Sequence, residues 1–502
     1  MTEKSLCREN IIKDTSVFSG SVYISQAMFF IRGFLNARIL GPGMYGLWSG
    51  LNIILNYSAY ARLGSLNAMN REIPYQNGRR SAEDMDRTRN AAFTICLATS
   101  FIFSLAVIAA GLLLRYRISL NEVIGFITIA FIAFILSIFE FYQTSVIALK
   151  KFTLISKANV VFAVLSVALT LVLVQRFNIY GVYAVAALIP LLNLSYLWFK
   201  EPCRVKLYFD LKEMSSLIKI GLPLGAINFL DATVINIPSI IVLALLGKAG
   251  LGYYSVAILA TRFLTYFPNS VHRTFEPYIY QRYGETHDIS DLKKYLFKPV
   301  QVMALLFPVI LGAYYTAVIF FIRHFLTKYT AAIQPFLIIS IGIFFISFAP
   351  TSNAFITAMN KQRFLIPVYL AGIAIASLSS IVFINMGYGV TAPALGLLLA
   401  FFFIGSAVFI YAANHYLKNA AKCFLYLAGL CGPLAYIAAV VFFSGVFIPD
   451  APDIFTDSLR LGSRFAVLFI FSAPLLYAAD NKTRIISDVL GFLKAKRHTI
   501  KT

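Results

Sequence analysis

The sequence predicts an all-α integral membrane protein with about 14 transmembrane helices. Three observations support this: 59% of the 502 residues are hydrophobic, only 13% are charged, and the mean hydropathy is +0.77. A soluble protein carries about 25% charged residues. The apolar stretches are spread over the whole chain, which excludes a soluble domain held by a single membrane anchor.

Fourteen apolar stretches account for the predicted helices, because a helix needs about 20 apolar residues to cross a bilayer. In chain order their approximate limits are 16–38, 44–64, 91–114, 122–148, 155–175, 179–198, 217–246, 251–272, 297–319, 331–357, 363–384, 389–415, 422–447 and 461–479. The first stretch lacks a following small-residue cleavage site, so we expect it to be an uncleaved signal anchor.

The distribution of Lys and Arg predicts the orientation of these spans. With the N-terminus inside, cytoplasmic segments hold 31 of the 43 Lys and Arg residues, outer segments hold nine and spans hold three. This asymmetry predicts that both termini are cytoplasmic. It also explains most of the net charge of +21 by topology and lipid headgroup contact, without a nucleic acid partner.

The longest predicted outer loop, 448–460, carries Asp450, Asp453 and Asp457. Three carboxylates suggest calcium, but their spacing is not that of a calcium-binding loop. We therefore expect a solvated loop, and the sequence predicts no metal site.

Three pairs of similar segments indicate an internal duplication. Two pairs are "YGVYAVA" from Tyr180 with "YGVTAPA" from Tyr388, at an offset of 208, and "LGPGMYGLW" from Leu40 with "LGKAGLGYY" from Leu246, at an offset of 206. The third pair is "LKKF" ending at Phe152 with "NKQRF" ending at Phe364. Each unit has six spans, an even number, so both enter the membrane in the same sense. Transporters use such parallel repeats.

The repeat predicts four parts of the chain. These are an N-terminal lobe at 1–198, a basic cytoplasmic linker at 199–216, a C-terminal lobe at 217–415, and helices 13 and 14 with a cytoplasmic tail at 416–502. The two six-helix lobes are expected to be pseudo-symmetric, and the last helix pair lies outside the repeat.

Twelve repeated spans plus two, with "RILGPGMYGL" before span 2, "LNAMNREIP" after it and "LGYYSVA" opening span 8, resemble the O-antigen (Wzx-type) flippases. These are polysaccharide transporters of the multidrug/oligosaccharidyl-lipid/polysaccharide exporter superfamily. The resemblance covers nearly the whole chain, and its motifs describe architecture rather than a catalytic signature.

The resemblance implies two lobes arranged in a V that export by alternating access. The implied substrate is an undecaprenyl-pyrophosphate-linked glycan, carried from the cytoplasmic to the outer leaflet of the bacterial inner membrane. A polysaccharide polymerase and a chain-length regulator are the expected protein partners, besides the lipid bilayer itself.

A stripe of aromatic and polar residues marks the predicted substrate-binding face. In span 2 the stripe consists of Trp48, Asn52, Asn56 and Tyr60, and the offset of 206 carries it to Tyr254, Ile258, Arg262 and Tyr266 in span 8. Residues four apart share one helix face, and aromatic rings with amides suit sugars. Interfacial aromatic belts and interhelical hydrogen bonds of the Asn residues are the alternatives.

Arg262 lies about 11 residues, or ~16 Å, from either end of its predicted span. A charge at the bilayer centre costs at least ~2.5–3.5 kcal/mol, so it needs a partner or a water-filled cavity. Two interpretations stay open: a structural ion pair with Asp231 of span 7, or a phosphate ligand in the cavity.

The other charged residues inside spans have separate predicted roles. Arg32 and Arg62 lie nearer the ends of spans 1 and 2, so snorkelling is the first explanation and cavity lining the second. Glu140 and Asp231 are the candidate ion-coupling residues, with hydrogen bonding to neighbouring polar groups as the alternative for Glu140.

The charges inside the spans favour an anionic cargo, because the spans contain three arginines but only two clearly intramembrane acids. A multidrug or cation antiporter is the runner-up, and a peptidoglycan-precursor flippase is a closer alternative. A membrane polymerase or ligase would need a sizeable outer loop, so we expect a transporter rather than an enzyme. No cofactor is predicted; protons, sodium ions or the membrane potential are the candidate driving forces.

Overall fold

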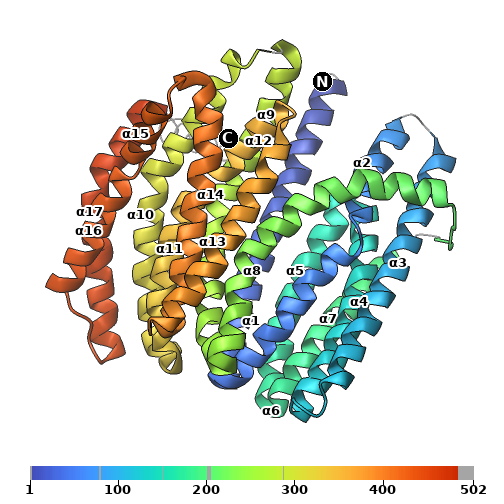
Figure 1. The fold of residues 1–502 in the computed structure, drawn as a ribbon, viewed down its shortest axis with the longest axis horizontal. Helices are drawn as coiled ribbons and strands as arrows, with labels where there is room; N and C mark the ends of the chain where they lie inside the picture. The colour runs from blue at the N-terminus through green and yellow to red at the C-terminus, as the bar shows by residue number, and fades with distance from the viewer. Residues whose placement is uncertain (1–2, 79–80, 150, 201–204, 287, 484–502) are drawn as a thin grey trace, which may run out of the picture. The chain divides into compact units, whose positions relative to one another are not determined.

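The computed structural model describes residues 3–78, 81–149, 151–200, 205–286 and 288–483, and this part of the chain is helical without any β-strand (Figure 1). The predicted all-α class is therefore confirmed. The predicted linker residues 201–204 and tail residues 484–502 lie outside the described residues.

The described chain divides into two compact units, up to Ser255 and from Val256 onward. The predicted lobe limits, 1–198 and 217–415, stay a prediction. The first unit contains α1 (Glu3–Ala61), α2 (Ser65–Gly78), α3 (Ala82–Leu113), α4 (Leu120–Ala148), α5 (Phe152–Leu169), α6 (Gln175–Phe177), α7 (Ile179–Lys200) and most of α8 (Leu211–Arg262). The second contains the end of α8, then α9 (Tyr266–Thr286), α10 (Lys293–Phe325), α11 (Ile333–Ile346), α12 (Ala349–Ala358), α13 (Leu365–Asn385), α14 (Ala392–Leu417), α15 (Ala420–Leu430), α16 (Gly432–Phe447) and α17 (Ile454–Thr483).

Eleven helical segments of the described chain are long and apolar enough to cross a membrane. One of them, Gly225–Asn269, covers the predicted spans 7 and 8 together. Predicted spans 1 and 2 both lie in α1, which is not among the eleven because it is less apolar; it carries Arg32, Asn52 and Asn56. The multi-pass membrane architecture is thus confirmed.

Two helices contain a sharp kink at positions related by the predicted repeat. Gly41 in α1 has φ 70° and ψ 171°, and Gly247 in α8 has φ 71° and ψ −171°. A positive φ favours glycine because a Cβ atom would be strained there. The two kinks are 206 positions apart, so the offset found in the sequence recurs in the backbone.

The two kinked helices cross closely just after these glycines. A Cβ atom added at Gly46 would lie 1.7 Å from the Lys248 carbonyl oxygen, and one added at Gly252 would lie 2.0 Å from the Pro42 carbonyl oxygen. Both pairs of equivalent residues, Gly46 with Gly252 and Pro42 with Lys248, are again 206 positions apart. The crossing is therefore reciprocal, as expected of a pseudo-two-fold relation.

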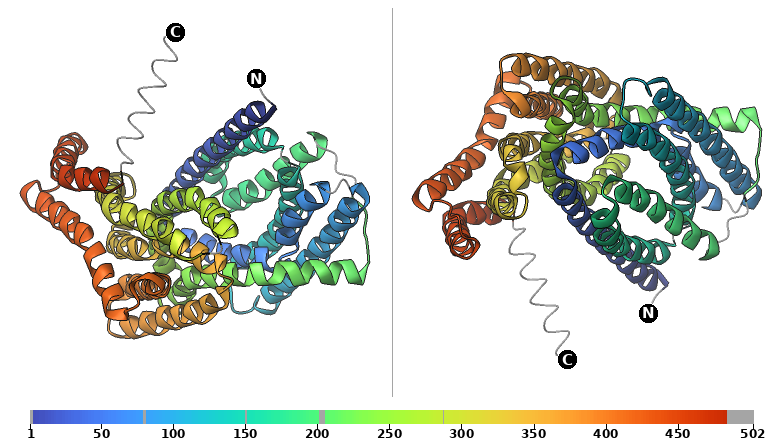
Figure 2. Two further views of the ribbon diagram at one scale, coloured as in Figure 1. Left: turned by 90° about the horizontal axis from the view of Figure 1, so that it is seen from above. Right: turned by 90° about the horizontal axis from the view of Figure 1, so that it is seen from below.

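The core of the first unit lies between α2, α3, α4, α5 and α7, where Met69, Ile95 and Phe141 are almost fully buried. The beginning of α8 packs on this core through Leu217. Figures 1 and 2 show that α8 first runs across the ends of its neighbours and then bends to run alongside them. Pro223 lies inside the helix, and proline is a common cause of such bends.

The second unit is built around buried aromatic residues of α11, α12 and α14, among them Phe336, Phe344, Phe355 and Phe409. The pair α16 and α17 packs against α10. Burial of large aromatic rings is a major source of packing energy in such a core.

Candidate functional site

The predicted stripe on α1 runs from the protein interior to an exposed surface. The Trp48 side chain is only 8% exposed, and its ring centroid lies 6.1 Å from that of Tyr183 on α7. Asn52 is half-buried and donates from Nδ2 to the Trp48 carbonyl oxygen at 3.0 Å, whereas Asn56 is exposed. Tyr254 of the equivalent stripe is fully buried. Sugar contact by Trp48 or Tyr254 would therefore require their surroundings to move.

Tyr60 belongs to an aromatic cluster that joins α1 to α8. Its hydroxyl donates to the Asn228 carbonyl oxygen at 3.1 Å, and its ring lies edge-on to Phe229 at 5.4 Å. Tyr57 contacts the same Phe229 ring at 5.7 Å and donates to Thr233 Oγ1 at 3.4 Å. The cluster places two tyrosines of α1 against one turn of α8.

Asp231 lies beside this cluster, two residues after Phe229. Its side chain is half-buried and lies near enough to Tyr60 for an electrostatic interaction. Among the described residues of the first unit, no cation forms an ion pair with it. Asp231 belongs to the first unit and Arg262 to the second, so the predicted Arg262–Asp231 pair stays a prediction.

Arg62 and Glu140 form an ion pair inside the first unit. Arg62 follows the last residue of α1, and its Nη2 lies 2.5 Å from Glu140 Oε2 on α4. The Arg62 Nε donates to the Ala59 carbonyl oxygen at 3.2 Å. Its Nη1 is buried and has no hydrogen-bond partner in the described structure. One ionic contact and one backbone contact thus hold this guanidinium.

The expectation that Arg62 snorkels to the surface is wrong, because its side chain is only 7% exposed and turns inward to Glu140. The sequence contained a signal for this pair. In the predicted topology Arg62 lies close to the cytoplasmic end of span 2 (44–64), and Glu140 lies in the cytoplasmic third of span 4 (122–148). Opposite charges at similar depth in a bilayer are expected to pair.

Arg32 lies on the first part of α1, with its guanidinium carbon 5.1 Å from the centre of the Phe29 ring. A guanidinium over an aromatic face is a cation–π contact. A second ion pair, absent from the sequence predictions, joins Lys248 Nζ to Glu122 Oε2 at 2.8 Å. Lys248 lies directly after the Gly247 kink, so the pair joins this part of α8 to the beginning of α4.

Arg262 stands at a break in the α-helix, within its predicted span. Helix α8 ends at Arg262, a 3₁₀ turn covers Phe263–Thr265, and α9 begins at Tyr266. The predicted span 251–272 therefore contains a 3₁₀ turn, although Gly225–Asn269 is one helical segment long and apolar enough to cross a membrane. The Arg262 side chain is exposed and that of Tyr266 is half-buried. A 3₁₀ stretch within a longer helix often marks a functional hinge.

Tyr314 on α10 provides a physical reason for this break. Its hydroxyl donates to the Ala260 carbonyl oxygen at 2.8 Å, and its ring stacks on Phe263 at 5.4 Å. In a regular α-helix that carbonyl would accept a hydrogen bond from the N–H group of residue 264. Nothing in the local sequence around Arg262 indicates a partner 54 positions away.

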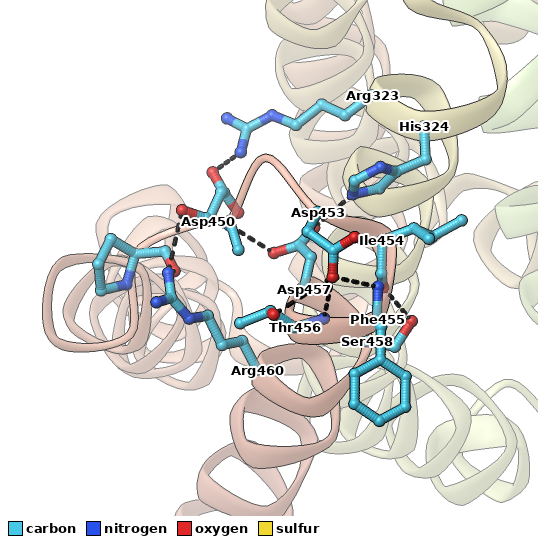
Figure 3. Close-up of polar contacts among 12 residues, drawn as sticks. Arg323, His324, Asp450, Asp453, Ile454, Phe455, Thr456, Asp457, Ser458 and Arg460 are labelled. Atoms are coloured by element: carbon cyan, nitrogen blue, oxygen red, sulfur yellow. Dashed lines mark hydrogen bonds and ion pairs between the residues drawn. The ribbon is translucent and has the colours of Figure 1, made fainter.

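The three aspartates of the predicted outer loop are engaged with protein groups (Figure 3). Asp450 pairs with Arg323 of α10 and, at 2.7 Å, with Arg464 of α17. Asp457 Oδ2 lies 2.7 Å from His324 Nε2, and its Oδ1 accepts from the Ala451 N–H at 2.9 Å. The loop is therefore not simply solvated: it fastens α17 to α10.

Asp453 caps the start of α17. Its Oδ2 accepts from the Thr456 N–H at 3.0 Å and the Phe455 N–H at 3.1 Å. These two hydrogen bonds hold the pKa of Asp453 below its usual range.

The side chains of this candidate site can bind ligands and form ion pairs. The first unit holds the Arg62–Glu140 ion pair and the acid Asp231, which has no ion-pair partner among the described residues of that unit. The second unit exposes the permanently charged Arg262 at a helix break. An exposed guanidinium is well suited to a phosphate, which it can grip with two parallel hydrogen bonds.

Comparison with known proteins gives a family and a fold. A model of the family described as "Polysaccharide biosynthesis protein" matches residues 35–327. Comparison with curated protein sequences gives no match.

Several solved structures share the fold. An inward-facing multidrug resistance MATE transporter of the MOP superfamily is 12% identical with a TM-score of 0.68, over 79% of this chain and 96% of that one. The lipid II flippase MurJ in an inward closed conformation is 15% identical with a TM-score of 0.60, over 92% and 99%. An outward-facing MATE transporter is 13% identical with a TM-score of 0.57, over 82% and 96%. These structures are transporters and a flippase, in agreement with the prediction of a transporter.

Proposed function

The chain belongs to the polysaccharide biosynthesis protein family, and from that premise we propose that it is a lipid-linked oligosaccharide flippase. It carries an undecaprenyl-pyrophosphate-linked repeat unit, of O-antigen or another surface polysaccharide, from the cytoplasmic to the outer leaflet of the bacterial inner membrane. The transporter fold, shared with a lipid II flippase among others, supports this proposal.

The exposed side chain of Arg262 is the observation on which the proposal of an anionic substrate rests. An exposed arginine within a predicted span needs water or a ligand. Pyrophosphate offers the charge and the geometry that a guanidinium prefers. Arg32, Asn52, Asn56, Tyr60 and Tyr266 are the further proposed substrate contacts.

Asp231 and Glu140 are the proposed ion-coupling groups. Asp231 has no ion-pair partner in the described first unit, and Glu140 can exchange its contact with Arg62 for a proton or a sodium ion. The membrane potential adds about 2.3 kcal/mol per exported negative charge per 100 mV. A polymerase and a chain-length regulator are the proposed partners, and both termini are placed in the cytoplasm.

Arg262 variants test the proposal in reconstituted vesicles and in cells. Arg262→Ala should weaken binding of the pyrophosphate-linked glycan by about 1.5–3 kcal/mol, or ten- to hundred-fold, because it removes a hydrogen-bonded charge. Arg262→Lys should retain part of the activity, since it keeps the charge but loses the planar fork. Lys328→Ala, an exposed cation of the same unit, is the matched control.

Membrane abundance separates this role from a structural pair. If Arg262 and Asp231 stabilise each other, both single variants should lose folded protein and the double variant, Asp231→Asn with Arg262→Gln, should recover it. Normal abundance with lost export in Arg262→Ala supports the ligand role.

Deletion of the gene should leave lipid-linked repeat units on the cytoplasmic leaflet. Persistence of the surface polymer in the deletion strain, with export of a cationic dye lost instead, would favour the multidrug or cation antiporter. Transport of lipid II in place of the repeat unit would favour the peptidoglycan-precursor flippase.

A further inference from the structure

The segment between α7 and α8 has one face packed against the protein and one face exposed. Residues 205–210, here called the linker strand, are not helical. The side chains of Leu207, Phe209 and Leu211 are 57%, 74% and 80% exposed, whereas those of Tyr208 and Asp210 are half-buried. Alternation with a period of two is typical of an extended chain. Leu207, Phe209 and Leu211 thus form an apolar ridge along one side.

Contacts with α3 fix the direction in which this ridge points. The Lys206 N–H donates to Asn90 Oδ1 at 3.0 Å, and the Tyr208 N–H donates to Thr94 Oγ1 at 2.9 Å. Val205 and Tyr208 also pack against the core of the first unit. Because two backbone hydrogen bonds and the packing of Val205 and Tyr208 hold the opposite face, the strand cannot turn its apolar ridge inward without losing these contacts.

The start of α8 extends the same fixed surface. Asp210 Oδ1 accepts from the Lys212 N–H at 2.9 Å and caps the helix, and the pKa of Asp210 is held low chiefly by this bond. Glu213 accepts from Thr88 Oγ1 of α3 at 3.0 Å. The first part of α8, in Figure 2, runs across the ends of its neighbours rather than along them.

The position along the chain places the strand at a membrane surface. Helix α7, long and apolar enough to span a membrane, ends at Lys200. Five residues further on the linker strand begins, and five residues reach at most about 17 Å. Trp198 and Phe199, at the end of α7, are exposed aromatic residues, which are common at membrane interfaces.

The charges around the ridge select the lipid. Lys200, Lys206 and Lys212 are all exposed. The positive-inside rule assigns this side of the protein to the cytoplasmic leaflet, whose anionic lipids attract basic segments near the surface. Three apolar side chains beside three lysines match a membrane surface, where negatively charged headgroups cover apolar acyl chains.

We propose that the linker strand is a membrane-surface anchor that binds anionic phospholipid. The ridge of Leu207, Phe209 and Leu211 enters the boundary between headgroups and acyl chains, and Lys200, Lys206 and Lys212 contact lipid phosphates. The linker predicted as a cytoplasmic segment thereby becomes part of the membrane interface, and it ties the start of α8 to both α3 and the bilayer.

Tryptophan fluorescence in the full-length reconstituted protein tests the placement. Phe209→Trp, and independently Leu207→Trp, should add emission that is quenched by phosphatidylcholine brominated near the headgroup and is protected from aqueous iodide. Tyr208→Trp, on the face toward α3, should be quenched much less by either. Quenching of residue 209 by iodide and not by bromolipid overturns the proposal, since the ridge then faces water. Protection from both quenchers also overturns it, because protein then covers the ridge.

Lipid selectivity tests the role of the lysines. In vesicles of equal bromolipid content, brominated phosphatidylglycerol should associate with the site at Phe209→Trp more strongly than brominated phosphatidylcholine, by about five-fold per contacting lysine, the equivalent of about 1 kcal/mol. Adding Lys206→Gln and Lys212→Gln should remove most of this preference while the quenching depth stays the same. An unchanged preference in that variant overturns the anionic-lipid assignment.

Discussion

The Arg62–Glu140 ion pair offers a quantitative test of the first unit. The two side chains meet at 2.5 Å, and the Arg62 side chain is 7% exposed while that of Glu140 is 33% exposed. The perturbations are Glu140→Gln, Arg62→Gln and the double variant. Because the two partners differ in exposure, the two single variants should differ in cost.

The magnitude follows from which charge is left behind. Glu140→Gln leaves a buried guanidinium without a counter-charge, and removing one partner of a buried pair costs about 3–5 kcal/mol. Arg62→Gln leaves a carboxylate that is one-third exposed, so water can solvate it and the cost should approach the ~1 kcal/mol of an exposed pair. The double variant should cost less than Glu140→Gln alone.

Unfolding of the purified protein can be followed by its buried thiols. Cys96 and Cys423 are almost fully buried, so a thiol-reactive dye reports their exposure on heating, alongside membrane abundance. Arg87→Gln is the matched control, because its ion pair with Glu83 is on the surface with both side chains more than half exposed. It should leave the unfolding midpoint nearly unchanged.

Two results would refute this reasoning. Effects of the single variants that simply add, within about 0.3–0.5 kcal/mol, would show that the two groups do not interact in solution. Equal losses from Glu140→Gln and Arg62→Gln would show that the exposed edge of Glu140 faces lipid rather than water.

Three further predictions concern the helix crossing, the helix break and the outer loop. Gly46→Ala should lower the folded yield and the unfolding midpoint, because the added Cβ atom overlaps the Lys248 carbonyl of α8. Gly43→Ala is the control, since nothing lies within 4 Å of its added atom. Equal effects of the two variants would contradict the close crossing. Tyr314→Phe should cost about 1 kcal/mol of stability by removing the hydrogen bond to the Ala260 carbonyl. Amide hydrogen exchange at Leu264 should become slower, because the freed carbonyl can then accept from that N–H group; unchanged or faster exchange would show that the break has another cause. The pKa of Asp453 is lower in the folded protein than its unfolded value of 3.8, so the ionised carboxylate stabilises the fold above pH 3.8, and this contribution is lost as the pH falls through the folded pKa. The unfolding midpoint of Asp453→Asn should therefore fall less than that of the natural protein between pH 5 and pH 3. Parallel curves for the two proteins would disprove the capping role.

The sequence by itself determined the membrane class, the all-α fold and the repeat. Hydropathy and charge are properties of local composition, so a single chain displays them directly. The offset of 206 predicted from "LGPGMYGLW" and "LGKAGLGYY" reappears in the matching backbone angles of Gly41 and Gly247, because a positive φ leaves glycine as its local signature. Arg62, Glu140, Asp231 and Arg262 could be singled out since charges are rare in apolar segments.

Only the tertiary structure decided what these residues contact. Arg62 meets Glu140 across 78 positions of sequence, and Trp48 lies in the interior against Tyr183. The break after Arg262 depends on a tyrosine hydroxyl from α10, and Asp450 forms ion pairs with side chains of α10 and α17. Each contact depends on how helices rotate and pack against one another, and that choice is made by the sum of many weak contacts between distant segments, which no local pattern in the sequence displays.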